Sequence, residues 1–136
     1  MAIVNWRGDA IVAAQEQAFE ETNHALVNLF AREITEYKWQ WPRVTERRRG
    51  RRRIGTPRDI VDRGELRNSY QGPEFRREQH MLVAEHIWDA PHALPVHEGA
   101  TMRNGTELPA RPWTLKPVSE ANAVFERLAR RRLAEV

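Results

Sequence analysis

The sequence predicts an α+β fold in which two long helices, one near each end of the chain, pack on a small antiparallel sheet. Apolar residues recur with helical spacing near both ends of the chain. Between these two regions, apolar and polar residues alternate in the manner of a strand. The chain has 136 residues, a length typical of a single domain. We therefore expect one domain over residues 1–136.

The first helix is expected over about residues 9–38, with Asp9 as the N-cap that accepts free amide hydrogens of the first turn. No glycine or proline interrupts this region, and Trp39, Trp41 and Pro42 follow it. Its apolar stripe consists of Ile11, Ala14, Ala18, Phe19, Thr22, Leu26, Leu29, Phe30, Ile34 and Tyr37. A stripe of this kind indicates the core face of a helix rather than a cofactor site.

An arginine-rich run follows, and it has six arginines in seven residues: Arg47, Arg48, Arg49, Arg51, Arg52 and Arg53. Like charges repel, so we expect an exposed loop over residues 47–55. Such a loop could contact phosphates or an acidic protein surface, or it could simply be solvated. No aromatic residue lies among the arginines, so sequence-specific recognition of DNA is not expected.

Two short helices are expected next. Thr56 and Pro57 form a start signal for a helical turn over residues 56–61. Asp62 can cap a second short helix that ends near residue 68, with Leu66 facing inward and Arg67 facing outward.

The central region predicts two strands, over residues 69–72 and 79–88, with residues 73–78 as a turn or irregular link between them. Both faces of the second strand carry apolar residues. One face is therefore expected to lie on the long helix, and the other against a neighbouring chain.

Residues 92–117 form a long crossing between this strand and the last helix, and they hold four of the eight prolines of the chain. A connection longer than about 12–15 residues is usually functional or disordered. This one carries too much apolar surface for a solvated linker, including Val96 and Trp113. We expect an extended arm that packs on its own domain or on a neighbouring chain.

The final helix is expected over residues 118–133. Its inward stripe consists of Val118, Ala121, Phe125 and Leu128. Three arginines at residues 130–132 lie in its last turn, where positive charge interacts favourably with the helix dipole.

Composition narrows the chemistry of the chain. There is no cysteine, so disulfides, thiolate metal sites and a cysteine nucleophile are excluded. Phosphate-binding, nucleophile-elbow and zinc-protease motifs are missing from the sequence. A metal site at His92, His97 and Glu98 would require the loop to bring them together. We expect neither a cofactor nor a metal, and no membrane segment, because no apolar run approaches about 18–20 residues.

Two segments carry a family resemblance. Residues 62–69 read DRGELRNS, which resembles the D-x-G-x-L-R-x-S signature of tailed-bacteriophage neck and tail-completion (head–tail joining) proteins. Residues 93–99 and 109–113 read ALPVHEG and PARPW, which are similar to a second signature of that family, A-x-x-V-x-x-G followed by P-A-R-P-F. The resemblance covers most of residues 56–130, and the order of expected elements agrees with it.

The resemblance implies a structural virion protein of the phage neck, not an enzyme, assembled in the host cytoplasm. Such proteins form a ring, commonly of six copies, between head-closing proteins and the tail tube or its terminator, and genomic DNA passes through the ring. A ring requires that one surface of a subunit meets a different surface of the next. The alternative function is a small basic nucleic-acid-binding protein that uses the arginine-rich run.

Under the ring interpretation, five residues are candidates for contact with the neighbouring subunit: Arg67, Val96, Arg111, Pro112 and Trp113. Arg67 and Arg111 would pair with carboxylates on the acidic first helix of the next copy. The alternative that the sequence leaves open is that Arg111 and Trp113 close the core of their own domain.

Overall fold

The computed structural model describes residues 1–35, 45–46, 53–54, 65–101, 103, 105 and 107–136. Its helices are α1 (Gly8–Ile34), α2 (Glu65–Asn68), α3 (Ala93–Glu98) and α4 (Leu115–Ala134). Its strands form three antiparallel pairs: β1 (Thr45–Glu46) with β2 (Arg53–Ile54), β3 (Tyr70–Glu78) with β4 (Met81–Trp88), and β5 (Ala100–Thr101) with β6 (Glu107–Leu108). The α+β class predicted from the sequence is confirmed.

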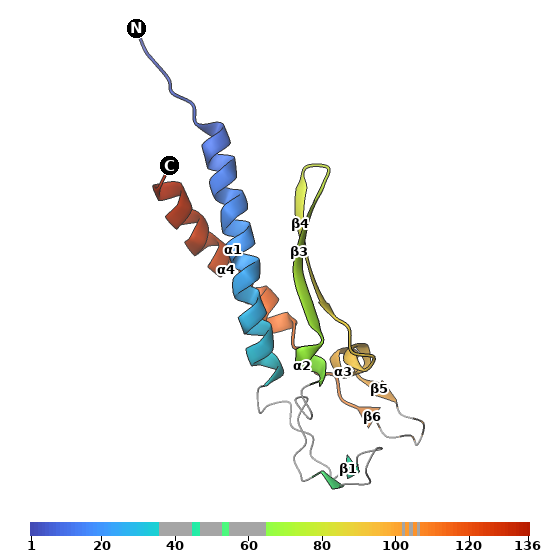
Figure 1. Cartoon of the computed structure of the whole chain (residues 1–136). Coiled ribbons are helices and arrows are strands. Elements are labelled where there is room, and N and C mark those ends of the chain that lie inside the picture. The colour runs from blue at the N-terminus through green and yellow to red at the C-terminus, as the bar shows by residue number, and fades with distance from the viewer. Residues whose placement is uncertain (36–44, 47–52, 55–64, 102, 104, 106) are drawn as a thin grey trace.

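Helix α1 is the central element of this arrangement. Figure 1 shows α4 on one side of α1 and the β3–β4 hairpin on the other, with both chain ends at the same end of the molecule. The two helices run antiparallel and pack along each other. The prediction that both helices pack on the sheet is therefore correct for α1, whereas α4 packs mainly on α1.

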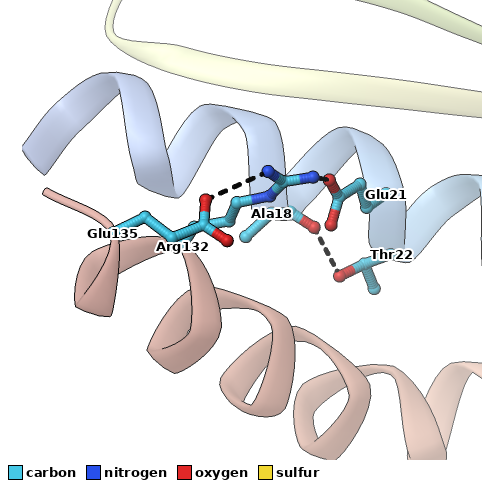
Figure 2. Close-up of polar contacts among 5 residues, drawn as sticks. All are labelled: Ala18, Glu21, Thr22, Arg132 and Glu135. Carbon is cyan, nitrogen blue, oxygen red and sulfur yellow. Dashed lines mark hydrogen bonds and ion pairs between the residues drawn. The ribbon is translucent and has the colours of Figure 1, made fainter. Parts of the chain in front are cut away.

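Small side chains let α1 and α4 approach closely. Ala18 of α1 has no exposed surface, and the neighbouring Thr22 is buried. The Thr22 hydroxyl donates a hydrogen bond of 2.7 Å to the Ala18 carbonyl oxygen, so its burial leaves no unpaired polar group. Beside it, the Arg132 guanidinium of α4 donates to the Glu21 carboxylate of α1 and to Glu135 (Figure 2).

The β3–β4 hairpin is longer than the sequence predicts. The expected link at residues 73–78 belongs to β3, and the turn is at Gln79 and His80. Pro73 suggested a break because proline cannot donate to a strand ladder. In the structure the ladder is irregular between Gln71 and Glu74, so Pro73 lies where no regular pairing is needed.

The crossing at residues 92–117 is not an extended arm. It folds into α3 and the β5–β6 pair, and its last three residues begin α4. The chain leaves α3 at Gly99, which has a φ of 81°. A Cβ atom there would lie 2.9 Å from the Leu108 carbonyl oxygen and 3.0 Å from the Ala110 nitrogen. Glycine is therefore required for the fold-back of this segment.

Several local predictions are wrong or lie outside the described residues. The N-cap of α1 is Arg7, with no side-chain cap bond, so Asp9 lies in the first turn instead. Val118 is exposed, not inward. Arg53 and Ile54 form β2, so the expected loop at residues 47–55 includes a short strand.

Two other predictions lie outside the described residues, because these omit 36–44 and 55–64. They are the predicted end of the first helix and the predicted helix at 56–61.

The main core cluster lies at the C-terminal end of α1. It consists of Ile34, Leu66, Ala93 and Trp113, and the partly buried Trp88, Ala90 and Val96 pack against it. These residues come from α1, α2, β4, α3 and the segments next to them, so the cluster joins elements that are distant in sequence.

Candidate functional site

The two segments that carry the family resemblance meet in the main core cluster. Leu66 comes from the first segment and is 1% exposed, as the sequence predicts for an inward residue. Ala93, Val96 and Trp113 come from the second. The Trp113 ring lies 5.7 Å from the Trp88 ring and 4.7 Å from the His97 ring, both in edge-to-face geometry. Edge-to-face contacts of this kind add to the stabilisation from burial.

His97 ties α3 to the start of α4. Its Nδ1 lies 2.6 Å from a Glu98 carboxylate oxygen, and its Nε2 lies 2.8 Å from the Thr114 hydroxyl. Because the carboxylate accepts the Nδ1 hydrogen, the neutral ring accepts the Thr114 hydroxyl hydrogen at Nε2. Thr114 is the N-cap residue of α4, so this pair of contacts fixes where α4 begins relative to α3.

The predicted subunit-contact residues lie at or near this core in the single chain. Arg111 and Trp113 are buried, Val96 packs against the core cluster, and Arg67 and Pro112 are partly buried. The backbone N–H of Arg111 donates to the Val96 carbonyl oxygen at 2.9 Å. For Arg111 and Trp113, the interpretation as an exposed contact is therefore replaced by the alternative that they close the core of their own domain.

The arginine-rich run is described only at Arg53, whose backbone pairs with Glu46 across the β1–β2 ladder. The other five arginines, Arg47, Arg48, Arg49, Arg51 and Arg52, lie outside the described residues. Their predicted contact with DNA or an acidic surface stays a prediction.

A partly buried polar network that the sequence did not indicate joins the hairpin to α1. Tyr70 of β3, His86 of β4 and Asn23 of α1 form a chain of hydrogen bonds, with Tyr70 Oη 2.7 Å from His86 Nδ1 and His86 Nε2 2.9 Å from Asn23 Oδ1. The Asn23 amide donates to the Phe19 carbonyl, so its Oδ1 accepts from His86. His86 Nδ1 then accepts the Tyr70 hydroxyl hydrogen, which requires a neutral imidazole.

The surroundings of His86 favour that neutral form. Burial lowers the pKa of His86 below its usual value, and repulsion from a protonated His24 lowers it further. The ring also contacts Phe30 edge-to-face and stacks on Tyr70. A proton on Nδ1 would displace the Tyr70 hydrogen from its acceptor.

This network predicts a pH dependence of stability. The unfolded chain protonates His86 near the ordinary histidine pKa of about 6.5, whereas the folded chain resists protonation. The unfolded state therefore binds more protons as the pH falls below that value, and stability decreases. We expect the urea midpoint of the wild type to fall more between about pH 7.5 and about pH 5.5 than that of His86→Gln.

His80 in the hairpin turn provides the matched control, because it is exposed. His80→Gln is expected to keep the wild-type dependence on pH. An identical pH-dependent loss in wild type and His86→Gln would contradict the role assigned to His86.

Among the described residues, no group of three or more histidine, aspartate or glutamate side chains is arranged to hold a metal ion. His97 and Glu98 contact each other, but His92 does not join them in a site of that kind. None of the helices in the described part of the chain is long and apolar enough to span a membrane.

Comparison with known proteins gives no relative for this chain. No family model, curated protein or solved structure matches it. The interpretation of the core cluster therefore depends on the residues of this chain and on the resemblance that its two segments carry.

Proposed function

We propose that this chain is a structural subunit of a bacteriophage neck, forming a ring that joins the head-closing proteins to the tail tube or its terminator. The family that the chain resembles forms rings commonly of six copies, with genomic DNA passing through them. The observation that carries the proposal is that both signature segments, more than 20 residues apart in the sequence, pack into one core cluster.

The residues of the signature have structural roles in this cluster. Leu66 is buried, and the Ser69 hydroxyl donates to the Leu66 carbonyl oxygen at 2.7 Å, closing the short helix α2. Gly99 permits the fold-back after α3. Trp113 fills the centre of the cluster. The signature residues of this chain stabilise its fold. Such a role is expected in a family of structural assembly proteins, which supports the proposal.

The shape of the molecule also supports the proposal. A two-stranded hairpin is marginal on its own and needs packing for stability. The β3–β4 hairpin rests on α1 by one face only among the described residues, and the other face is open (Figure 1). An open face beside a rigid core is suited to contact with another subunit.

The proposal is tested by the assembly state of the purified protein. Native mass spectrometry and negative-stain electron microscopy are expected to show a closed symmetric oligomer with a central opening. A monomer at all protein and salt concentrations, with no binding to head-closing or tail proteins, would contradict the proposal.

The alternative function is nucleic-acid binding by the arginine-rich run. Measurements of DNA binding and of ring assembly on the same purified protein distinguish it from the neck proposal. Changing the six arginines at 47–53 to glutamine would abolish salt-dependent DNA binding under the alternative. Under the neck proposal the ring persists in this variant whatever its affinity for DNA.

A further inference from the structure

The inference starts from the side of the β3–β4 hairpin that faces away from α1. Successive side chains on a strand point to opposite faces. Four side chains of the hairpin contact α1. Phe75 packs on Phe19, and Trp88 packs on Phe30. Arg77 pairs with Glu16, and His86 is hydrogen-bonded to Asn23. The alternate positions therefore point outward, and we call them the outer hairpin face: Glu74, Arg76, Glu78, Met81, Val83, Glu85 and Ile87.

The outer hairpin face is acidic and partly apolar. It carries three carboxylates and one guanidinium, and Arg76 already donates to Glu78 and Glu85. Glu74 makes no ion pair with any described residue. Met81 is 60% exposed and Ile87 is 40% exposed. Exposed apolar side chains set among charges are typical of a contact surface.

A second open surface lies on α4, on the side away from α1. Its exposed charged residues are Lys116, Glu120, Glu126, Arg127, Arg130 and Arg131, so positive charge predominates. Leu115 is an exposed apolar residue at the start of this helix. Within the described part of the chain, the one ion pair on this face joins Arg130 to Glu126, at 3.9 Å and with both side chains largely exposed. We call this surface the outer α4 face.

The two faces match in length and in order. The eight residues of β4 span about 26 Å at about 3.3 Å each, and the 20 residues of α4 span about 30 Å. Arg77 near the hairpin turn pairs with Glu16, and Arg132 near the end of α4 pairs with Glu21. Glu85, which is opposite Glu74 in the ladder, is next to His86, and His86 bonds Asn23 of α1. The Glu74–Glu85 pair and the basic last turns of α4 are therefore level with neighbouring residues of α1.

The apolar residues are level as well. Ile87 is next to Trp88 in β4, and the Trp88 ring packs on Trp113. Trp113 is two residues before Leu115 in the sequence. The exposed Ile87 therefore lies near the same end of the molecule as the exposed Leu115. A second copy placed alongside in the same orientation would bring Glu74 towards the arginines of α4 and Ile87 towards Leu115.

We infer that the outer hairpin face of one copy docks on the outer α4 face of the next copy, and that this is the ring contact of the proposed neck function, on which the inference rests. The faces lie on opposite sides of α1 (Figure 1). Joining two different surfaces gives a heterologous contact, which closes into a ring when the rotation permits.

Charge distinguishes this contact from a symmetric dimer through the hairpins. Two outer hairpin faces brought together would oppose carboxylates to carboxylates, and like charges that face each other in an interface disfavour the contact. The outer α4 face offers the opposite sign. The partner that the charges favour is thus a different surface of the same chain.

The test reverses one charge on each face. Glu74 and Arg127 are both exposed and neither pairs with a described residue, so Glu74→Arg and Arg127→Glu should leave the fold intact. Each variant alone is expected to self-associate at least about tenfold more weakly than the wild type in sedimentation velocity.

Mixing the two variants is the decisive measurement. In an alternating ring, Arg at position 74 of one variant meets Glu at position 127 of the other, and Glu74 meets Arg127 at the next contact. The equimolar mixture is therefore expected to recover ring assembly that neither variant shows alone. Glu107→Arg on β6, an exposed charge reversal outside both faces, should assemble like the wild type.

The results of these experiments distinguish a failure of the inferred contact from a failure of the proposed neck function. If the wild type forms rings and the single reversals assemble equally well, or if the mixture fails to recover assembly, this contact is overturned and the neck proposal stands. If the wild type forms no ring, both are overturned. Thermal melts followed by circular dichroism verify that each variant is folded.

Discussion

Replacing Trp113 by alanine is expected to lower the free energy of unfolding by about 3–5 kcal/mol, as for other large aromatic residues removed from cores. Trp113 is 2% exposed and lies in the cluster with Ile34, Leu66 and Ala93. Its ring also contacts Trp88 and His97 edge-to-face. The variant would leave a cavity where α2, α3 and β4 meet, and urea unfolding followed by far-ultraviolet circular dichroism measures the loss.

Two substitutions serve as controls for this prediction. Trp6→Ala makes the same chemical change at a side chain that is 82% exposed, so it should alter stability by no more than about 0.5 kcal/mol. Trp113→Phe keeps an aromatic ring and removes an indole N–H that has no acceptor among the residues described. It should therefore cost much less than Trp113→Ala. Equal losses for Trp113→Ala and Trp6→Ala would contradict the assignment of Trp113 to the core.

The sequence left the position of Trp113 undecided for a physical reason. A tryptophan between prolines is equally suited to an interface and to a core, since both bury its ring. The choice depends on whether residues 92–114 fold back on their own domain. That fold-back requires the left-handed Gly99, the short α3 and the His97–Thr114 contact, which arise from tertiary packing.

Long periodic segments were predicted well, because burial of one face determines them. Of the predicted stripe on α1, Ala14, Ala18, Leu26, Phe30 and Ile34 are all buried. The start of α4 differs from the prediction by a few residues, because local signals compete at the ends of helices. Asp9 shows this, because an acidic side chain favours a first turn whether or not it is the cap.

Interruptions by proline and glycine were predicted less well. The first strand was expected to end at Gly72, yet β3 continues to Glu78 because the partner strand accommodates an irregular pair. Likewise Pro95 lies within α3, whose first turn tolerates proline. In both cases a neighbouring element supplies the constraint that the local sequence lacks.

The candidate site changed most between sequence and structure. Residues chosen as contacts, such as Arg111 and Trp113, are buried, whereas the exposed surfaces inferred to contact each other are on the β3–β4 hairpin and on α4. The sequence did predict that the second face of residues 79–88 would need a cover. It also predicted that the first face lies on the long helix, and contacts of β4 with Phe30 and Asn23 of α1 confirm this. It did not indicate that α4 presents arginines on the opposite side.

Replacing Phe30 by alanine is expected to lower the free energy of unfolding by about 3–5 kcal/mol. Phe30 is 3% exposed, and its ring lies 5.1 Å from His86 and 5.0 Å from Trp88, both edge-to-face. It is the side chain of α1 that holds the base of the hairpin against the core. The loss is measured by urea unfolding, and hydrogen exchange should show β3 and β4 amides opening more readily than those of α4.

Phe75→Ala is the matched control, since Phe75 is 37% exposed and contacts Phe19 and His24 near the hairpin turn. Less area is removed from water there, so its loss should be clearly smaller than that of Phe30→Ala. A smaller effect for Phe30→Ala than for Phe75→Ala would mean that the hairpin is held at its turn. Because the hairpin carries the acidic face inferred to contact the next copy, Phe30→Ala should also weaken self-association, although residue 30 is buried and touches no neighbour.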